Sequence, residues 1–256
     1  MNLFKKLWIV AVSALGLSVA TTSIAYAKAP VWQVTKGDNT VYIGGTVHVL
    51  SQSDYPLPDA FDRAYGLSHT LVLEMDMSKA QGVEFQQTMI KKMTYQDGRT
   101  YADVLKPETV KKLNAHMTNR NIPIASLQTF KPSMLSVTLT MIELQRLGLG
   151  GTGVDSFYNM RGVQDKKGFE FLELPEQQIE FLATMGEGHE DELINYTLRD
   201  MANLATMMSE MKQAWRSGDN KALYDIGGKE WHDEFPASYE QLIIKRNNNW
   251  MPAIEN

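Results

Sequence analysis

The feature that most constrains the fold is a nearly continuous apolar run, Thr70–Leu73, which leads into the carboxylates Glu74 and Asp76. A strand this uniformly apolar is usually buried on both faces, as happens in a sheet with helices on either side. Helical patterns follow the run and fill most of the chain after it. We therefore predict an α/β protein with a mixed β-sheet core, flanked by helices and carrying large helical insertions.

A second predicted strand leads to a histidine. Val31–Val34 and Val41–Ile43, separated by the turn residues Lys36–Asn39, predict a β-hairpin. Its second strand continues into Gly44–Gly45, where the missing Cβ atoms let the backbone approach a ligand closely, and then presents His48. On spacing alone, a single histidine after a strand is more often structural than functional.

Three predicted strands end in side chains capable of chemistry: His48, Glu74 and, just before a helix that begins at Pro175, Glu173. Sheets flanked by helices place ligand sites at the carboxyl ends of their strands. An imidazole beside carboxylates suits a divalent cation such as Mn²⁺ or Zn²⁺, or acid–base hydrolysis. Two of them also have simpler interpretations: Glu173 would favour the helix that follows it, and Glu74 would cap a helix or pair with a lysine.

Prolines mark the beginnings of the predicted helices. Helices are predicted from Pro107, from Pro132 to about Leu147, and from Pro175, because proline is favoured in the first helical turn. Short helices are also predicted from Asp59 to about Leu67 and from Val154 to Met160. The glycine-rich break Gly148–Gly153 lacks the spacing of a phosphate-binding loop. An apolar stripe indicates adaptable core or a lid surface rather than a cofactor site; it consists of Met201, Leu204, Met207, Met208 and Met211.

The first 27 residues have the form of a secretory signal peptide. They combine Lys5 and Lys6, an apolar stretch and the small-x-small pattern Ala25–Ala27, so cleavage before Lys28 is expected. An uncleaved membrane anchor is the alternative. Cleavage would leave one domain, residues 28–256, in the periplasm or outside the cell with no stable membrane anchor.

Composition excludes several classes of protein. The chain has no cysteine, which excludes disulfide bonds and a lipoprotein anchor. Its net charge of −5 becomes more negative once Lys5 and Lys6 are removed, which argues against nucleic acid as a partner.

The segment from Gly45 to His48 resembles the first Gly-x-x-His motif of the TraB/GumN/Tiki family. Further matches follow in the family's order: Trp32–Val34, Leu57–Pro58, Leu73–Glu74, Lys131–Pro132, Gly153–Asp155, Leu172–Glu173, Gln177, Arg246–Asn247 and Trp250. The resemblance covers almost all of the chain after the signal peptide. It implies a fold like that of the erythromycin esterase and ChaN proteins.

The resemblance also implies an activity. Tiki-like members are divalent-metal-dependent proteases, for which Mn²⁺ or Co²⁺ is expected rather than Zn²⁺, and bacterial GumN-type members are exported. His48 would be a metal ligand or catalytic base, and Glu74 a metal ligand or the group that activates water. Glu173 would be a further metal ligand or a carboxylate that supports the ligands from behind. Arg246 would neutralise an oxyanion or orient a carboxylate; without the resemblance it would pass for a surface arginine. Supporting positions in the site would be held by Gly45, Asp155 and Asn247.

One departure from the family pattern concerns its second Gly-x-x-His motif, which follows the Arg-Asn helix. The sequence has no such motif between Arg246 and Asn256. Gly186–His189 has the right letters, but it lies between two predicted helices and before Arg246, so we interpret it as a coincidence. Either the sequence is a truncated copy or the protein lacks the second histidine, and in both cases we expect a domain that is incomplete at its C-terminal end.

The sequence leaves three functional hypotheses. The leading one is an exported, metal-dependent hydrolase that acts on peptide bonds. The second is a non-catalytic periplasmic protein that binds a peptide, haem or another small ligand in the same cleft, which the missing motif favours. The third is a helical protein with a structural or interaction role and no site.

Overall fold

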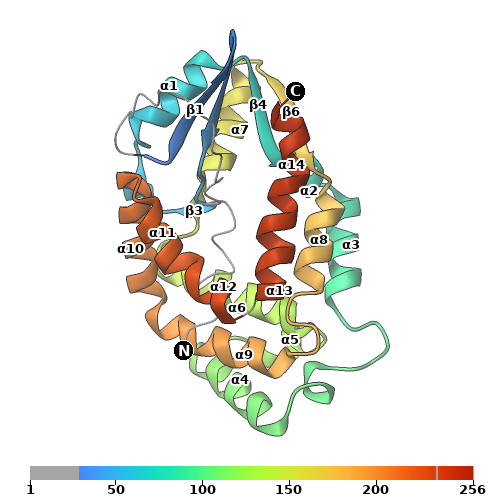
Figure 1. Cartoon of the computed structure of the whole chain (residues 1–256). Coiled ribbons are helices and arrows are strands. Elements are labelled where there is room, and N and C mark those ends of the chain that lie inside the picture. The colour runs from blue at the N-terminus through green and yellow to red at the C-terminus, as the bar shows by residue number, and fades with distance from the viewer. Residues whose placement is uncertain (1–28, 235, 256) are drawn as a thin grey trace. The chain divides into compact units, whose positions relative to one another are not determined.

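The computed structural model describes residues 29–234 and 236–255 (Figure 1). The predicted signal peptide, residues 1–27, lies outside these residues. The described residues form two compact units. We call residues 29–74, 148–172 and 206–255 the mixed unit, because it contains both strands and helices. We call residues 75–147 and 173–205 the helical unit.

The mixed unit opens with the predicted hairpin. β1 (Val31–Lys36) and β2 (Asn39–Gly44) are antiparallel, with register running from the pair Val31 and Gly44 to the pair Lys36 and Asn39. The two residues between the strands begin with Gly37, whose φ of +61° is the left-handed conformation such tight turns require. The hairpin prediction is confirmed.

The remaining strands form two more pairs. β3 (Val49–Leu50) is antiparallel to β5 (Gly151–Thr152), and β4 (Thr70–Met75) pairs with β6 (Gly168–Glu173). The α/β class is confirmed, although the strands of the described residues form two-stranded sheets. Val72 in β4 is 48% exposed, so the expectation that this strand is buried on both faces is wrong at this position. A sheet of two strands has fewer neighbours to cover it than the larger sheet that the apolar pattern suggested.

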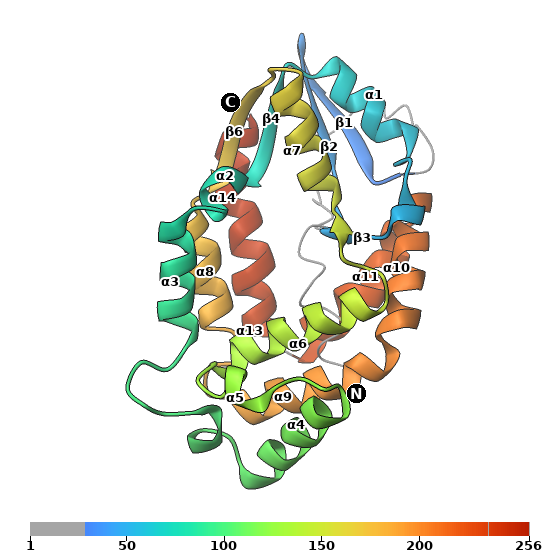
Figure 2. The same cartoon turned by 180° about the vertical axis from the view of Figure 1, so that it is seen from behind.

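Helices complete the mixed unit (Figure 2). They are α1 (Asp59–Leu67), α7 (Val154–Gln164), α10 (Leu204–Ser217), α11 (Asn220–Gly227), α12 (Lys229–Glu234), α13 (Pro236–Tyr239) and α14 (Lys245–Glu255), with a 3-10 turn at Gln52–Asp54 and a π-helical turn at Glu240–Ile244. The centre of the unit is Trp215, which is fully buried with its ring centroid 5.3 Å from that of Phe61. Its indole N–H also donates a hydrogen bond of 2.7 Å to the Gly45 carbonyl.

The helical unit is built from α2 (Met77–Ala80), α3 (Val83–Met93), α4 (Pro107–Asn119), α5 (Ile124–Leu127), α6 (Pro132–Arg146), α8 (Pro175–Ala183) and α9 (Glu190–Asp200), with 3-10 turns at Tyr101–Asp103 and Met201–Asn203. α4, α6 and α9 pack around an apolar core that includes Leu113, Met117, Leu135, Leu139 and Ile194. Between α6 and α9, the hydroxyl oxygens of Ser136 and Thr197 are 2.8 Å apart.

Several helix predictions are confirmed. α4, α6 and α8 each begin at the predicted proline, and the predicted helix from Asp59 to Leu67 is α1. The five residues of the methionine stripe are all buried, which confirms the interpretation as core. No helix within the described residues is both long and apolar enough to cross a membrane.

Candidate functional site

The loop that carries His48 is fixed by backbone contacts within the mixed unit. β2 ends at Gly44, and the chain continues through Gly45, whose N–H donates a 2.7 Å hydrogen bond to the Pro30 carbonyl. The Gly45 carbonyl in turn accepts the hydrogen bond from Trp215. A Cβ on Gly45 would lie 3.2 Å from Pro30 Cβ, closer than is comfortable. His48 thus follows an anchored loop and precedes β3, instead of lying at the end of the hairpin strand as the sequence suggested.

Gly153 brings the beginning of α7 against the backbone of His48. A Cβ on Gly153 would lie 2.3 Å from the His48 carbonyl oxygen, so only glycine fits there. Pairing of β3 with β5 and a 3.0 Å hydrogen bond from the Val154 N–H to the Val47 carbonyl hold the two segments together. The Gly153–Asp155 match in the sequence therefore corresponds to a close approach of two backbones.

Asp155, in the first turn of α7, faces His48. Its Oδ1 is 3.2 Å from His48 Nδ1, and the two side chains are 23% and 34% exposed respectively. Desolvation lowers the pKa of His48, but the close contact with Asp155 and the charges of Asp155 and Glu74 outweigh it, although Arg246 opposes them. The net effect raises the pKa of His48 from 6.5 to about 9. The imidazole is therefore protonated at neutral pH.

A second ion pair joins β4 to α14. Arg246 Nη2 donates to Glu74 Oε2 over 3.0 Å, and the two side chains are 7% and 24% exposed. The Arg246 guanidinium carbon also lies 5.0 Å from the centroid of the Trp250 ring, four residues further along α14. The interpretation of Arg246 as a surface arginine is therefore wrong. The Arg-Asn-x-x-Trp spacing could have indicated this contact, since residues four apart share one face of a helix.

The two ion pairs influence each other through their charges. Both lie in the mixed unit, and Glu74 and Arg246 each shift the pKa of His48. The group as a whole contains two cations and two carboxylates. We call His48, Asp155, Glu74 and Arg246 the charge cluster.

Two other polar residues singled out in the sequence, Glu173 and Asp76, have local partners. Glu173, at the end of β6, belongs to the helical unit, is 8% exposed and accepts a 3.3 Å hydrogen bond from the Gln178 amide. Asp76 is the N-cap of α2 and accepts a 2.9 Å hydrogen bond from the Ser78 N–H, so it has a structural role there. Asn247 is half-buried beside Arg246 on α14.

The second set of Gly-x-x-His letters forms a turn between α8 and α9. Gly186 and Gly188 have φ values of +74° and +78°, and His189 is the N-cap residue of α9. This geometry agrees with the interpretation of Gly186–His189 as a turn and not as a strand motif.

A metal centre requires converging ligands. The nitrogen and oxygen donors of His48, Asp155 and Glu74 are of the type that Mn²⁺ and Co²⁺ accept. However, no group of three or more His, Asp or Glu side chains among the described residues is arranged to hold an ion. Arg246 also places a positive charge against Glu74. The described residues therefore do not form a complete metal centre on their own.

Comparison with protein families gives one match. The family model described as the TraB/PrgY/gumN family matches residues 30–256. Comparison with curated proteins and with solved structures gives no match.

Proposed function

The chain belongs to the TraB/PrgY/gumN family, and from the charge cluster we propose that it is an exported hydrolase, periplasmic or secreted, that acts on peptide bonds. The observation that carries the proposal is the pairing of His48 with Asp155 next to the pairing of Glu74 with Arg246. A proton donor and a carboxylate are thus both held in fixed geometry in one unit. Hydrolysis of an amide needs both kinds of group.

The raised pKa of His48 suggests which residue would act as the acid and which as the base. Because its pKa is raised to about 9, His48 would act as the acid that gives a proton to the leaving amine, and not as the base. Asp155 would keep the imidazole charged and oriented. Glu74 would accept a proton from the attacking water, and Arg246 would hold that carboxylate in position and oppose negative charge on the reacting carbonyl oxygen.

The proposal includes a dependence on Mn²⁺ or Co²⁺, because the family resemblance implies one. Among the described residues, no three His, Asp or Glu side chains are arranged to hold an ion. We therefore assign no step to a metal, and the experiment includes the metal as a separate arm.

The test is cleavage of a defined peptide mixture, followed by mass spectrometry. Purified protein is assayed alone, with Mn²⁺, and with a chelator, beside the variants His48→Ala and Glu74→Gln. Matched controls are His232→Ala and Glu108→Gln, which change a histidine and a glutamate outside the charge cluster. We expect cleavage by the wild type and both controls, and a loss of about 100-fold or more in the two cluster variants. Equal cleavage by all five proteins would refute the proposal.

A binding function is the second candidate. The charge cluster contains two cations and two carboxylates, which would suit a peptide or another small ligand that carries both kinds of charge and is held without being cleaved. A wild-type protein that cleaves nothing but retains a peptide in equilibrium dialysis, and loses it in Arg246→Lys, would favour this candidate over the hydrolase.

A further inference from the structure

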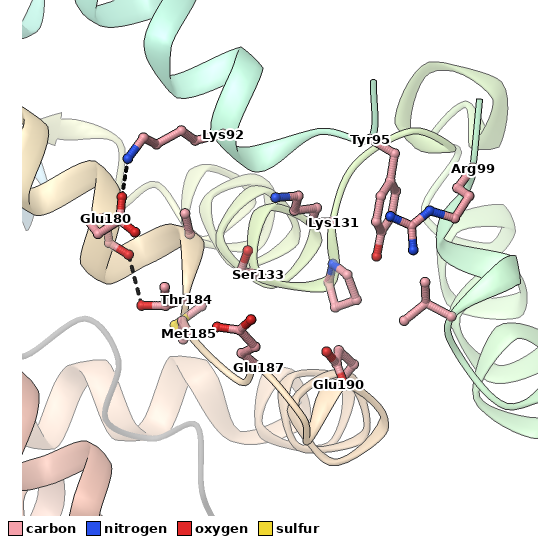
Figure 3. A pocket seen from close by; sticks show the side chains of 13 residues that line it. Lys92, Tyr95, Arg99, Lys131, Ser133, Glu180, Thr184, Met185, Glu187 and Glu190 are labelled. Carbon is pink, nitrogen blue, oxygen red and sulfur yellow. Dashed lines mark hydrogen bonds and ion pairs between the residues drawn. The ribbon is translucent and has the colours of Figure 1, made fainter. Parts of the chain in front are cut away.

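The helical unit contains a pocket of about 530 Å³. Three segments line it: the end of α3 with the loop that follows, the beginning of α6, and the end of α8 with the turn into α9 (Figure 3). All of the lining residues belong to the helical unit, whereas the charge cluster belongs to the mixed unit. The pocket includes Lys131 and Pro132, which the proposed hydrolase mechanism does not use.

The N-terminus of α6 forms one wall of the pocket. Lys131 is the N-cap residue and makes no side-chain capping bond, Pro132 is the first helical residue, and Ser133 follows. A helix of this length presents free N–H groups and a partial positive charge at its beginning, and both favour an anion.

Ser133 gives an independent indication of a ligand. The residue is only 3% exposed, and its hydroxyl oxygen has no hydrogen-bond partner among the residues the structure describes. Buried hydroxyl groups are nearly always hydrogen-bonded, because leaving one without a partner is unfavourable. In Figure 3 this hydroxyl lies in the middle of the lining side chains. An oxygen atom of a ligand would supply the missing partner.

The charged side chains of the pocket fall into two groups. Lys92 is paired with Glu180, and Arg99 is paired with Asp97 and lies over the Tyr95 ring. The Lys131 ammonium and the Glu187 carboxylate, by contrast, make no ion pair or side-chain hydrogen bond within the described part of the chain. Figure 3 shows these two side chains on opposite sides of Ser133. The Glu190 carboxylate is in no ion pair either but accepts a 3.1 Å hydrogen bond from the Gly188 N–H. Among the described residues, the pocket thus offers one ammonium and one carboxylate that have no partner.

We propose that this pocket binds a small zwitterion with a free carboxylate and a free ammonium group, such as an amino acid or a dipeptide. The carboxylate binds at the N-terminus of α6, where it accepts hydrogen bonds from the Ser133 hydroxyl and the Lys131 ammonium. The ammonium group binds Glu187. The lining contains as many basic as acidic side chains, which matches a ligand without net charge better than a polyanion; they are Lys92, Arg99, Lys131, Glu180, Glu187 and Glu190.

The test is titration calorimetry of the full protein with alanyl-alanine, beside its N-acetylated form, its C-terminal amide and inorganic phosphate. We expect alanyl-alanine to bind, and either blocked form to bind about tenfold more weakly, because each has lost one charged contact. Ser133→Ala should lower the affinity by about tenfold without lowering Tm, since it removes a hydroxyl that has no hydrogen-bond partner among the described residues.

Two further variants separate the ends of the ligand. Glu187→Gln should weaken alanyl-alanine and leave the N-acetylated form unchanged, whereas Lys131→Ala should weaken both. Lys111→Ala, which removes an exposed lysine of α4, is the matched control and should have no effect. No binding of alanyl-alanine, phosphate binding as tight as that of the dipeptide, or an equal loss in Lys111→Ala would overturn the proposal. Because the readout is binding, its failure is distinguishable from a failure of the hydrolase assay.

Discussion

The two units hold their polar groups in different ways. In the mixed unit, His48 and Asp155 form one ion pair and Glu74 and Arg246 form another, so the charges are matched before any ligand arrives. In the helical unit, the Ser133 hydroxyl is buried without a hydrogen-bond partner among the described residues. The charges of the first set are therefore paired within the protein, whereas the Ser133 hydroxyl would gain its partner from the ligand proposed above.

The largest expected change in stability comes from removing one charged side chain from each unit. Arg246→Ala should lower the free energy of unfolding by about 3 kcal/mol, because it leaves Glu74 without its buried partner. Lys131→Ala should change it by no more than about 0.5 kcal/mol, since the lysine has no ion pair to lose within the described residues. Urea unfolding at pH 7 measures both. Equal losses in the two variants would remove the distinction between the units.

A smaller change in stability is expected when the contact between α7 and the His48 backbone is disturbed. Gly153→Ala should lower the free energy of unfolding by about 2 kcal/mol, because the new methyl group would meet the His48 carbonyl oxygen. Gly66→Ala is the matched control: it lies inside α1 with open space around it, so it should raise stability by about 0.5 kcal/mol. The same unfolding measurement applies. A Gly153→Ala protein as stable as the wild type, with an unchanged His48 NMR titration, would contradict the close approach.

The smallest effect concerns pH. Since the pKa of His48 rises from about 6.5 in the unfolded chain to about 9 in the folded protein, its contribution to stability is complete below about pH 6.5 and is lost as pH rises through 9. The contribution should be about 1 kcal/mol, because the partly exposed imidazole is screened by solvent. Asp155→Asn should remove most of this dependence. An NMR titration that places the pKa of His48 near 6.5 in the wild type would be incompatible with the ion pair.

Much of the fold could be predicted because its signals are local. Pro107, Pro132 and Pro175 open helices through a preference that depends only on the first helical turn. The end of α7 was harder to predict. The sequence predicts that this helix ends at Met160, but it continues to Gln164. Its last turn shows no buried apolar face, since Met160 and Val163 are 50% and 63% exposed, so the pattern could not mark its end.

The candidate site could be predicted by its residues but not by its contacts. The motif letters identified His48, Glu74 and Arg246. The pairing of His48 with Asp155 depends on the β3–β5 pairing and on the approach of Gly153, which join distant parts of the chain and leave no local periodicity. The sequence also could not predict that the Ser133 hydroxyl has no hydrogen-bond partner among the described residues. That absence depends on which groups surround the residue and not on its being a serine.

The hydrogen bond from Trp215 to the Gly45 carbonyl gives the molecule an optical signal of its own. The indole is fully buried, and its N–H is attached to the loop that leads to His48. Movement of this loop away from the indole would expose the ring to water and shift its fluorescence to longer wavelength. In a variant whose other four tryptophans are replaced by phenylalanine, the emission of Trp215 would report, without any added label, when the loop changes position.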